Sequence, residues 1–147
     1  MKKFTTGAAA LSLALGGLLV APQVASATTA QPAGAYGCAG SQVGKYRLYN
    51  SSNRTDGYAY LYYSSASGGT NCAVYVTSVS RGTARYMSVQ LFGPGDQAPD
   101  DVGTYTQYAG PVRVTGTNGH CVSVIYEERP PGQSIVNGNS SGDVACG

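Results

Sequence analysis

Apolar and polar residues alternate in short runs along most of this chain, and glycine, proline, asparagine and aspartate separate one run from the next. This period of two, with no sustained 3.6-residue period, predicts β-strands rather than helices. Residues 72–79 show it best, because their alternate side chains form two sets that are both mostly apolar. One face would carry Cys72, Val74 and Val76, and the other Ala73, Tyr75, Thr77 and Val79. A strand with two apolar faces is expected at the centre of a fold.

Further strands are expected on both sides of this segment, at residues 45–49, 58–63, 84–92, 104–108, 112–115 and 121–126, with a weak last strand that ends at Cys146. Turns rich in glycine, proline and asparagine separate them, and Asn118-Gly119 is the strongest hairpin signal among these turns. The pattern predicts an all-β fold, namely a small disulfide-stapled β-sandwich or barrel of about seven or eight short antiparallel strands.

The first 27 residues follow a different pattern. Lys2 and Lys3 precede an apolar stretch at residues 8–20, and Ala25-Ser26-Ala27 follows as a small-x-small cleavage signal. This order predicts a secretory signal peptide over residues 1–27. A membrane anchor is the alternative, but the apolar stretch has roughly 13 residues, whereas a spanning helix needs roughly 20.

Cleavage after Ala27 would remove 27 of 147 residues and leave 120, which suits a single domain. Residues 28–37 consist mostly of small and polar residues that bury too little apolar surface to offset their ordering entropy, so we expect a flexible mature N-terminus there. Residues 38–147 are expected to form one β domain. Loss of Lys2 and Lys3 leaves seven basic and seven acidic residues, and this balance predicts no nucleic acid and no membrane as a partner.

The four cysteines, Cys38, Cys72, Cys121 and Cys146, all lie in the expected domain. A secreted chain meets an oxidising environment, so we expect two disulfides, for which three pairings exist. We favour Cys38 with Cys72 and Cys121 with Cys146, because each bond would close a local loop of roughly 25–35 residues and contribute about 3–4 kcal/mol. The rival pairing, Cys38 with Cys146 and Cys72 with Cys121, would tie the termini together. A zinc site is disfavoured because the sequence has no C-x-x-C pair and only one histidine.

Tyrosine is the most unusual feature of the composition, since ten of the twelve tyrosines lie between Tyr46 and Tyr108. On a strand, Tyr58, Tyr60 and Tyr62 would share one face. If that face is exposed, it forms a candidate ligand platform that can stack on sugars or contact another protein. The alternative is that these tyrosines fill a core that is poor in leucine.

Catalytic and metal-binding patterns are weak. His120 is the only histidine and no G-x-S-x-G motif accompanies it, so we expect an exposed turn residue. The members of the doublets Glu127-Glu128 and Asp100-Asp101 would point to opposite faces of a strand, and we expect solubilising charges. Residues 100–104 partly resemble the short calcium motif of βγ-crystallin-type domains, but Tyr105 stands where that motif has its second serine. We therefore expect no enzymatic activity, no metal and no cofactor.

Several segments resemble the spore-associated protein A family of small secreted proteins from streptomycetes and related actinobacteria. The resemblance rests on Asn71-Cys72-Ala73-Val74-Tyr75-Val76, on residues 101–112, and on Tyr60-Leu61-Tyr62-Tyr63, His120-Cys121-Val122 and Cys146-Gly147. It extends over residues 38–147 and departs at residues 127–134, where a charged, proline-bearing stretch replaces one with glycine and tryptophan. The resemblance implies a non-enzymatic exported protein associated with the spore or hyphal surface, with no catalytic residues to transfer.

We therefore expect a secreted, non-enzymatic extracellular protein, associated with the spore or cell surface. Its expected partner is a cell-wall or spore-surface polymer or another secreted protein. Two alternatives remain. One is a carbohydrate- or cell-wall-binding module that uses Tyr58, Tyr60 and Tyr62. The other is a proteinaceous inhibitor of a secreted hydrolase, in which the loop at residues 93–101 or Arg129-Pro130-Pro131 would be the reactive segment.

Overall fold

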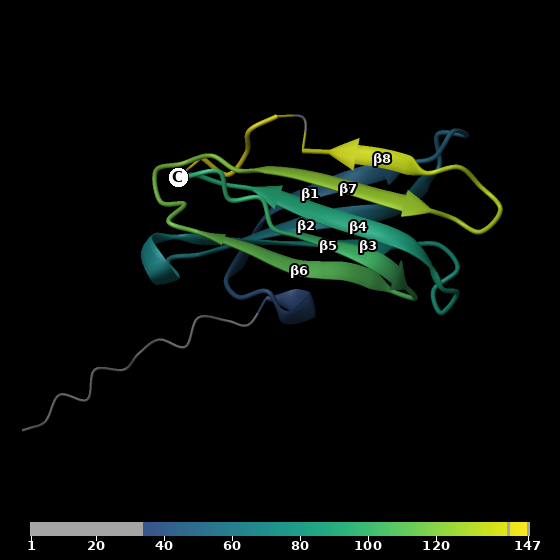
Figure 1. Cartoon of the computed structure of the whole chain (residues 1–147), viewed down its shortest axis with the longest axis horizontal. Coiled ribbons are helices and arrows are strands. Elements are labelled where there is room, and N and C mark those ends of the chain that lie inside the picture. The colour runs from purple at the N-terminus through teal and green to yellow at the C-terminus, as the bar shows by residue number, and fades with distance from the viewer. Residues whose placement is uncertain (1–33, 141, 147) are drawn as a thin grey trace, which may run out of the picture.

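The computed structural model describes residues 34–140 and 142–146, which form two four-stranded antiparallel sheets that face each other as a β-sandwich (Figure 1). Sheet 1 has the order β1 (Ser41–Tyr49), β2 (Thr55–Ser64), β3 (Thr70–Thr77) and β6 (Tyr108–Thr115). Sheet 2 has the order β5 (Asp100–Tyr105), β4 (Arg85–Phe92), β7 (Ser123–Arg129) and β8 (Val136–Asn139). The predicted all-β class is confirmed, and of the two expected architectures the sandwich is the one observed. The predicted leader, residues 1–27, lies outside the described residues.

The chain changes sheets three times, after β3, after β5 and after β6. The hairpin predicted at Asn118-Gly119 is wrong, because this turn carries the chain from β6 in sheet 1 to β7 in sheet 2. Here the backbone amides of Thr117 and Asn118 donate to the carbonyls of Gly69 and Gly68 in the β2–β3 connection. The dipeptide therefore specifies a local chain reversal, while bonding to a distant loop decides where the next strand goes.

Strand β3 lies at the centre of the fold, as its two apolar faces predicted, and seven of its eight residues are buried. Its inner face meets sheet 2 in the main core, where the rings of Tyr75 and Tyr126 stack with centroids 5.6 Å apart and planes at 14°. Aliphatic side chains surround this pair, including Leu48, Leu61, Met87, Val89, Leu91, Val112, Val114, Val122 and Val124. A second, smaller cluster lies on the outer face of sheet 1 and contains Cys38, Tyr62, Cys72, Val74 and Val76.

The two disulfides have the favoured pairing, Cys38–Cys72 and Cys121–Cys146, with sequence separations of 34 and 25 residues. The first attaches the N-terminal segment to the outer face of β3. The second attaches the C-terminal segment to the start of β7, beside an isolated antiparallel bridge between Val122 and Val144. Each bond therefore fastens one end of the described chain to a different sheet.

The described part of the expected flexible N-terminus is ordered. Residues 28–33 lie outside the described residues, but Ala35–Gly37 form a 3-10 turn, η1, on the outer face of sheet 1. The ring of Tyr36 contacts those of Tyr60 and Tyr108, and Arg113 donates a hydrogen bond to the carbonyl of Gly37. Composition alone did not reveal this order, because the turn is held by contacts with β2 and β6 and by the neighbouring disulfide.

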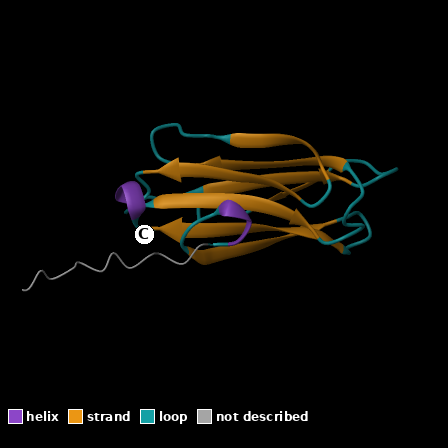
Figure 2. Ribbon diagram, turned by 90° about the horizontal axis from the view of Figure 1, so that it is seen from below, coloured by secondary structure: helices purple, strands orange, loops and turns teal. Residues whose placement is uncertain are grey.

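The strands of both sheets run along the long axis of the molecule, and most of the connecting loops gather at its two ends (Figure 2). The second 3-10 turn, η2 (Ala66–Gly68), lies in one of these loops. Within the described residues there is no helix of the length and apolarity that a membrane span requires.

Candidate functional site

The candidate platform residues Tyr58, Tyr60 and Tyr62 lie together on the outer face of sheet 1, away from the core between the sheets. They do not form a flat exposed surface. Tyr62 is only 6% exposed, whereas Tyr58 and Tyr60 are half-buried, with ring centroids 6.1 Å apart and planes tilted by 41°. The alternation along β2 thus places all three correctly on one face, but Tyr62 lies beneath the N-terminal segment and offers little ring surface.

A row of tyrosines nevertheless crosses this face, and we call it the tyrosine strip: Tyr49, Tyr58, Tyr60, Tyr36 and Tyr108. The last four rings follow one another in contact, whereas Tyr49 is joined to Tyr58 through the Arg47 side chain between them. Tyr36 connects its two halves, because its ring lies 6.3 Å from that of Tyr60, nearly parallel at 28°, and 5.2 Å from that of Tyr108. Tyr49 lies on β1 and Tyr108 on β6, which are the two edges of sheet 1. At about 4.8 Å per strand spacing, the strip spans roughly 14 Å across the sheet.

Two cations accompany the strip. The Lys45 ammonium lies 4.2 Å from the ring centroid of Tyr58 and 5.5 Å from that of Tyr60. The Arg47 guanidinium lies 5.4 Å from the ring centroid of Tyr49 and 5.8 Å from that of Tyr58, and it donates a hydrogen bond to the Tyr49 hydroxyl. These distances are within the range of cation–π attraction, which holds the cations among the rings.

Charge is segregated between the sheets. The strands of sheet 1 carry Lys45, Arg47 and Arg113, and their one acidic residue, Asp56, is buried. The strands of sheet 2 carry four acidic residues, Asp100, Asp101, Glu127 and the buried Glu128, and two basic ones, Arg85 and Arg129. The outer face of sheet 1 is therefore aromatic and basic, although residues 28–147 contain equal numbers of basic and acidic side chains.

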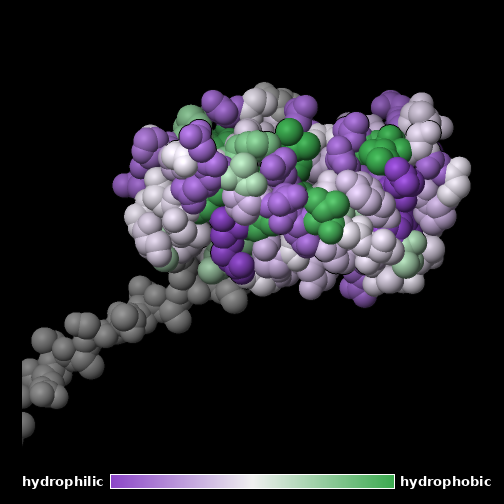
Figure 3. Space-filling view, viewed as in Figure 1, coloured by the Kyte–Doolittle hydropathy of each residue, from purple (hydrophilic) through white to green (hydrophobic). Residues whose placement is uncertain are grey.

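The outer face of sheet 2 lacks such a row. Its exposed apolar side chains include Val102 and Ile125. On the face turned toward the viewer in Figure 3, which carries β4, β5 and β7, hydrophobic side chains appear as spots interrupted by hydrophilic ones. Apolar residues scattered in this way are normal for a protein surface.

A buried polar network lies inside one end of the sandwich. Arg85 and Glu128 form an ion pair of 2.7 Å, and their side chains are 1% and 0% exposed. The Glu128 carboxylate also accepts hydrogen bonds from the hydroxyls of Thr77 and Tyr75. Burial, together with the bond to this carboxylate, raises the pKa of Tyr75 far above its ordinary value of 10.0. Glu128 is thus not the exposed solubilising charge that its doublet suggested, because period two places it on the inner face of β7 with Tyr126.

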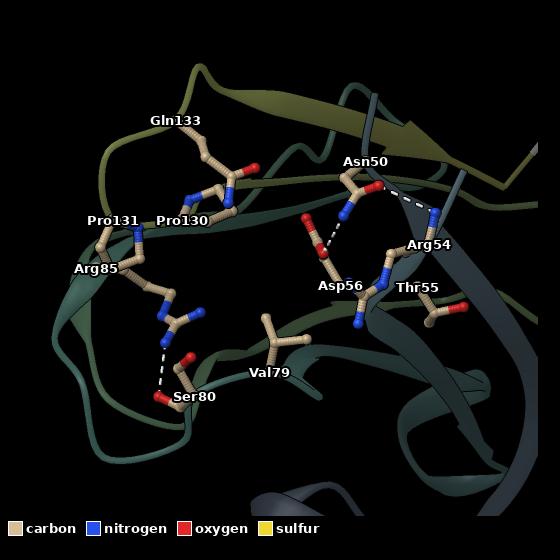
Figure 4. A pocket seen from close by; sticks show the side chains of 10 residues that line it. All are labelled: Asn50, Arg54, Thr55, Asp56, Val79, Ser80, Arg85, Pro130, Pro131 and Gln133. Atoms are coloured by element: carbon tan, nitrogen blue, oxygen red, sulfur yellow. Dashed lines mark hydrogen bonds between the residues drawn. The ribbon is translucent and has the colours of Figure 1, made fainter. Parts of the chain in front are cut away.

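A pocket of about 250 Å³ opens next to this network, between the loops at residues 50–56, 79–85 and 130–133 (Figure 4). Asp56 forms part of its wall and is 3% exposed. One carboxylate oxygen, Oδ1, accepts a hydrogen bond of 2.9 Å from the Asn50 amide, whereas Oδ2 is buried and no described residue donates to it. Arg85 also borders the pocket, but its guanidinium is bonded to Glu128, Ser80 and Thr83.

The remaining candidates lie apart from both surfaces. His120 is exposed in the β6–β7 connection. Asp101 accepts hydrogen bonds from the Tyr105 hydroxyl and the Gly110 amide, so its carboxylate braces the β5–β6 turn. The bond to Asp101 raises the pKa of Tyr105 to about 12. Within residues 34–140 and 142–146, no group of three or more His, Cys, Asp or Glu side chains is placed to hold a metal ion.

Of the two segments considered for an inhibitor, the loop at residues 93–101 is tied back to the fold, because Gln97 bonds to the backbone of Pro94 and Thr115. The other, Arg129-Pro130-Pro131, provides two prolines that line the pocket.

Sequence reasoning missed Asp56, Arg85 and Tyr36. Asp56-Gly57 had the composition of a turn, and Tyr36 belonged to a stretch of low complexity. Arg85 pairs with a residue 43 positions away, which no local pattern indicates. The sequence did contain a signal for the burial of Glu128. This residue lies two positions after Tyr126 and four after Val124, so period two places all three on the same buried face of β7.

No protein-family model matches this chain, and neither a curated protein nor a solved structure shows significant similarity to it.

Proposed function

We propose that this chain is a secreted, non-enzymatic protein that attaches to a polymer of the cell or spore surface through the tyrosine strip and its two cations. The observation that carries the proposal is the run of contacting rings from Tyr58 to Tyr108, with Lys45 held among them and Arg47 between Tyr58 and Tyr49. The leader predicted at residues 1–27 and the two disulfides support an extracellular location, since disulfides persist in oxidising compartments.

The chemistry of the strip favours a polysaccharide that bears negative charge. Tyrosine faces stack on the apolar faces of sugar rings while their hydroxyls remain hydrated. Lys45, Arg47 and Arg113 have no acidic partner, because the one ion pair among the described residues joins Arg85 to Glu128. Lys45 and Arg47 beside the rings, with Arg113 bonded to the Gly37 carbonyl on the same sheet, would bind carboxylate or phosphate groups on the polymer.

The direct test is retention of the mature protein on insoluble polymers. Peptidoglycan that keeps its anionic wall polymers, the same material after their removal, chitin and cellulose form the panel. We expect the strongest retention on the first material, and weaker retention as salt shortens the range of the charge interactions. Failure to bind any of the four would reject the polymer-binding function, and finding the protein only in the cytoplasm would reject secretion.

Variants locate the binding face. Tyr60→Ala should weaken binding by about 2- to 12-fold, because an aromatic contact contributes about 0.5–1.5 kcal/mol. The double change Lys45→Gln with Arg47→Gln should remove the preference for the anionic material. The matched control is Tyr86→Ala, which deletes a tyrosine with its own cation, Arg129, at 5.7 Å, but on β4 of sheet 2. If Tyr60→Ala and Tyr86→Ala weakened polymer binding equally, the assignment of the binding face to sheet 1 would be contradicted.

A further inference from the structure

The pocket beside Asp56 is a second, separate feature, at the loop end of the sandwich. It owes its character to an irregularity in the β1–β2 pairing, where Leu48 pairs with Gly57 and Tyr49 with Thr55, so that Asp56 has no partner residue on β1. A bulge of this kind redirects a side chain that regular alternation would place elsewhere. Regular alternation would put Asp56 on the outer face with Tyr58, but the bulge turns its side chain into the end of the sandwich.

Asp56 is held in place by hydrogen bonds to its carboxylate and to its backbone carbonyl. Asn50 donates to Oδ1 at 2.9 Å, and the backbone carbonyl of Asp56 accepts a hydrogen bond of 2.7 Å from the amide of Ser78. In Figure 4 the second oxygen, which is buried, lies on the side of Asp56 that faces Pro130 and Gln133 across the pocket. A buried carboxylate oxygen without a donor is costly, so a donor that enters this space would gain a strong, charge-assisted hydrogen bond.

The charges around the pocket favour a cation as that donor. The Arg85 charge is compensated by Glu128 at 2.7 Å. Arg54 also borders the pocket, but it is exposed and forms no ion pair with Asp56 among the described residues. Water screens an exposed charge far more than a buried one, so Asp56 dominates the field inside the pocket.

The size and walls of the pocket restrict the ligand further. A volume of about 250 Å³ corresponds to roughly eight water molecules at about 30 Å³ each. Val79, Pro130 and Pro131 supply apolar wall on the way to the carboxylate. An ammonium at the end of a short aliphatic stem matches both features, because the stem can lie along apolar surface while the charged head is bonded.

We infer that this pocket binds a linear alkyl ammonium group, of the kind a lysine side chain presents, with Asp56 Oδ2 as the acceptor. The pocket and the tyrosine strip are separate, so either proposal can be disproved without affecting the other. It gives the protein a way to engage the lysine side chain of a partner protein.

The test uses n-butylammonium as the probe and the amide resonances of the mature protein as the readout. We expect saturable shifts at Thr55, Ser80 and Gln133 with a millimolar Kd, and weaker binding by n-butanol and butyrate, which lack the charge or reverse it. Asp56→Asn should weaken binding at least tenfold, whereas Asp96→Asn, the same change on the exposed loop at the far end of β4, should leave it unaltered. Arg54→Gln should strengthen n-butylammonium binding, because it removes a positive charge from the border of the pocket.

Three results would overturn the inference. The absence of saturable shifts with the wild-type protein would mean that Oδ2 is merely hydrated, and this outcome does not depend on whether Asp56→Asn folds. Weaker binding after Arg54→Gln would show that the pocket recognises an anion instead. Stronger binding of glucosamine than of N-acetyl-lysine amide would contradict the linear aliphatic stem.

Discussion

Breaking the buried Arg85–Glu128 pair by removing one partner should destabilise the fold more than the loss of any other single polar contact. Glu128→Gln removes the negative charge and keeps the side-chain shape, so it leaves the Arg85 guanidinium buried without a counter-charge. Removing one partner of such a pair costs about 3–5 kcal/mol, whereas a domain of this size is stable by only about 5–15 kcal/mol. We therefore expect Glu128→Gln to remove about a fifth or more of the free energy of unfolding.

Urea unfolding measures this loss, with tyrosine fluorescence as the probe because the chain contains no tryptophan. For a slope near 1.5 kcal/mol per molar urea, a loss of 3 kcal/mol lowers the midpoint by about 2 M. The matched control is Glu127→Gln on the outward face of β7, where the carboxylate accepts bonds from Tyr86 at 3.0 Å and Ser88 at 3.4 Å. Glu127→Gln should lower the free energy of unfolding by less than about 1 kcal/mol, since this contact is partly exposed.

A double-mutant cycle completes the test, and it compares Arg85→Met, Glu128→Leu and the variant that carries both changes. Replacing both partners, Arg85→Met with Glu128→Leu, removes the buried charges together. The remaining cost should be about 1–3 kcal/mol, because the Tyr75 and Thr77 hydroxyls lose their acceptor. The double variant should therefore be more stable than Glu128→Gln alone. Additive losses from the two positions, or a loss below about 1 kcal/mol for Glu128→Gln, would refute this account of the network.

Two further predictions concern the cross-links and the tyrosines. The change Cys38→Ala with Cys72→Ala opens a loop of 34 residues and should lower the free energy of unfolding by about 4 kcal/mol in the chain-entropy model; a urea midpoint near that of the wild type would contradict it. Burial raises the pKa of Tyr126 to about 12 from 10.0, so the folded state retains this proton longer than the unfolded state. Its contribution to stability is complete below pH 10 and disappears as the pH rises through about 12. Absorbance of tyrosinate during an alkaline titration checks this, and a single transition near pH 10 for all tyrosines in the folded protein would be the contrary result.

Local pattern was sufficient for much of the fold. The period of two located most of the strands and placed Cys72, Val74 and Val76 on one face of β3. It also put Tyr58, Tyr60 and Tyr62 on one face of β2. It was wrong at residues 104–108, which include the turn between β5 and β6, and at the last strand, which is Val136–Asn139 and does not extend to Cys146. Loop length favoured the observed disulfide pairing, although it left the rival pairing open. These properties depend on residues close together in the chain, which is why the sequence by itself determined them.

Tertiary structure alone decided the two candidate sites. Tyr36 completes the tyrosine strip only because a disulfide and β6 hold the N-terminal turn on sheet 1. Asp56 faces the pocket only because the β1–β2 register shifts by one residue at that point. Glu128 acquires its partners from β3 and β4, at sequence separations of 43 to 53 residues. The pairing of distant segments sets these environments, and a sequence pattern of short range contains no information about which distant strand becomes a neighbour.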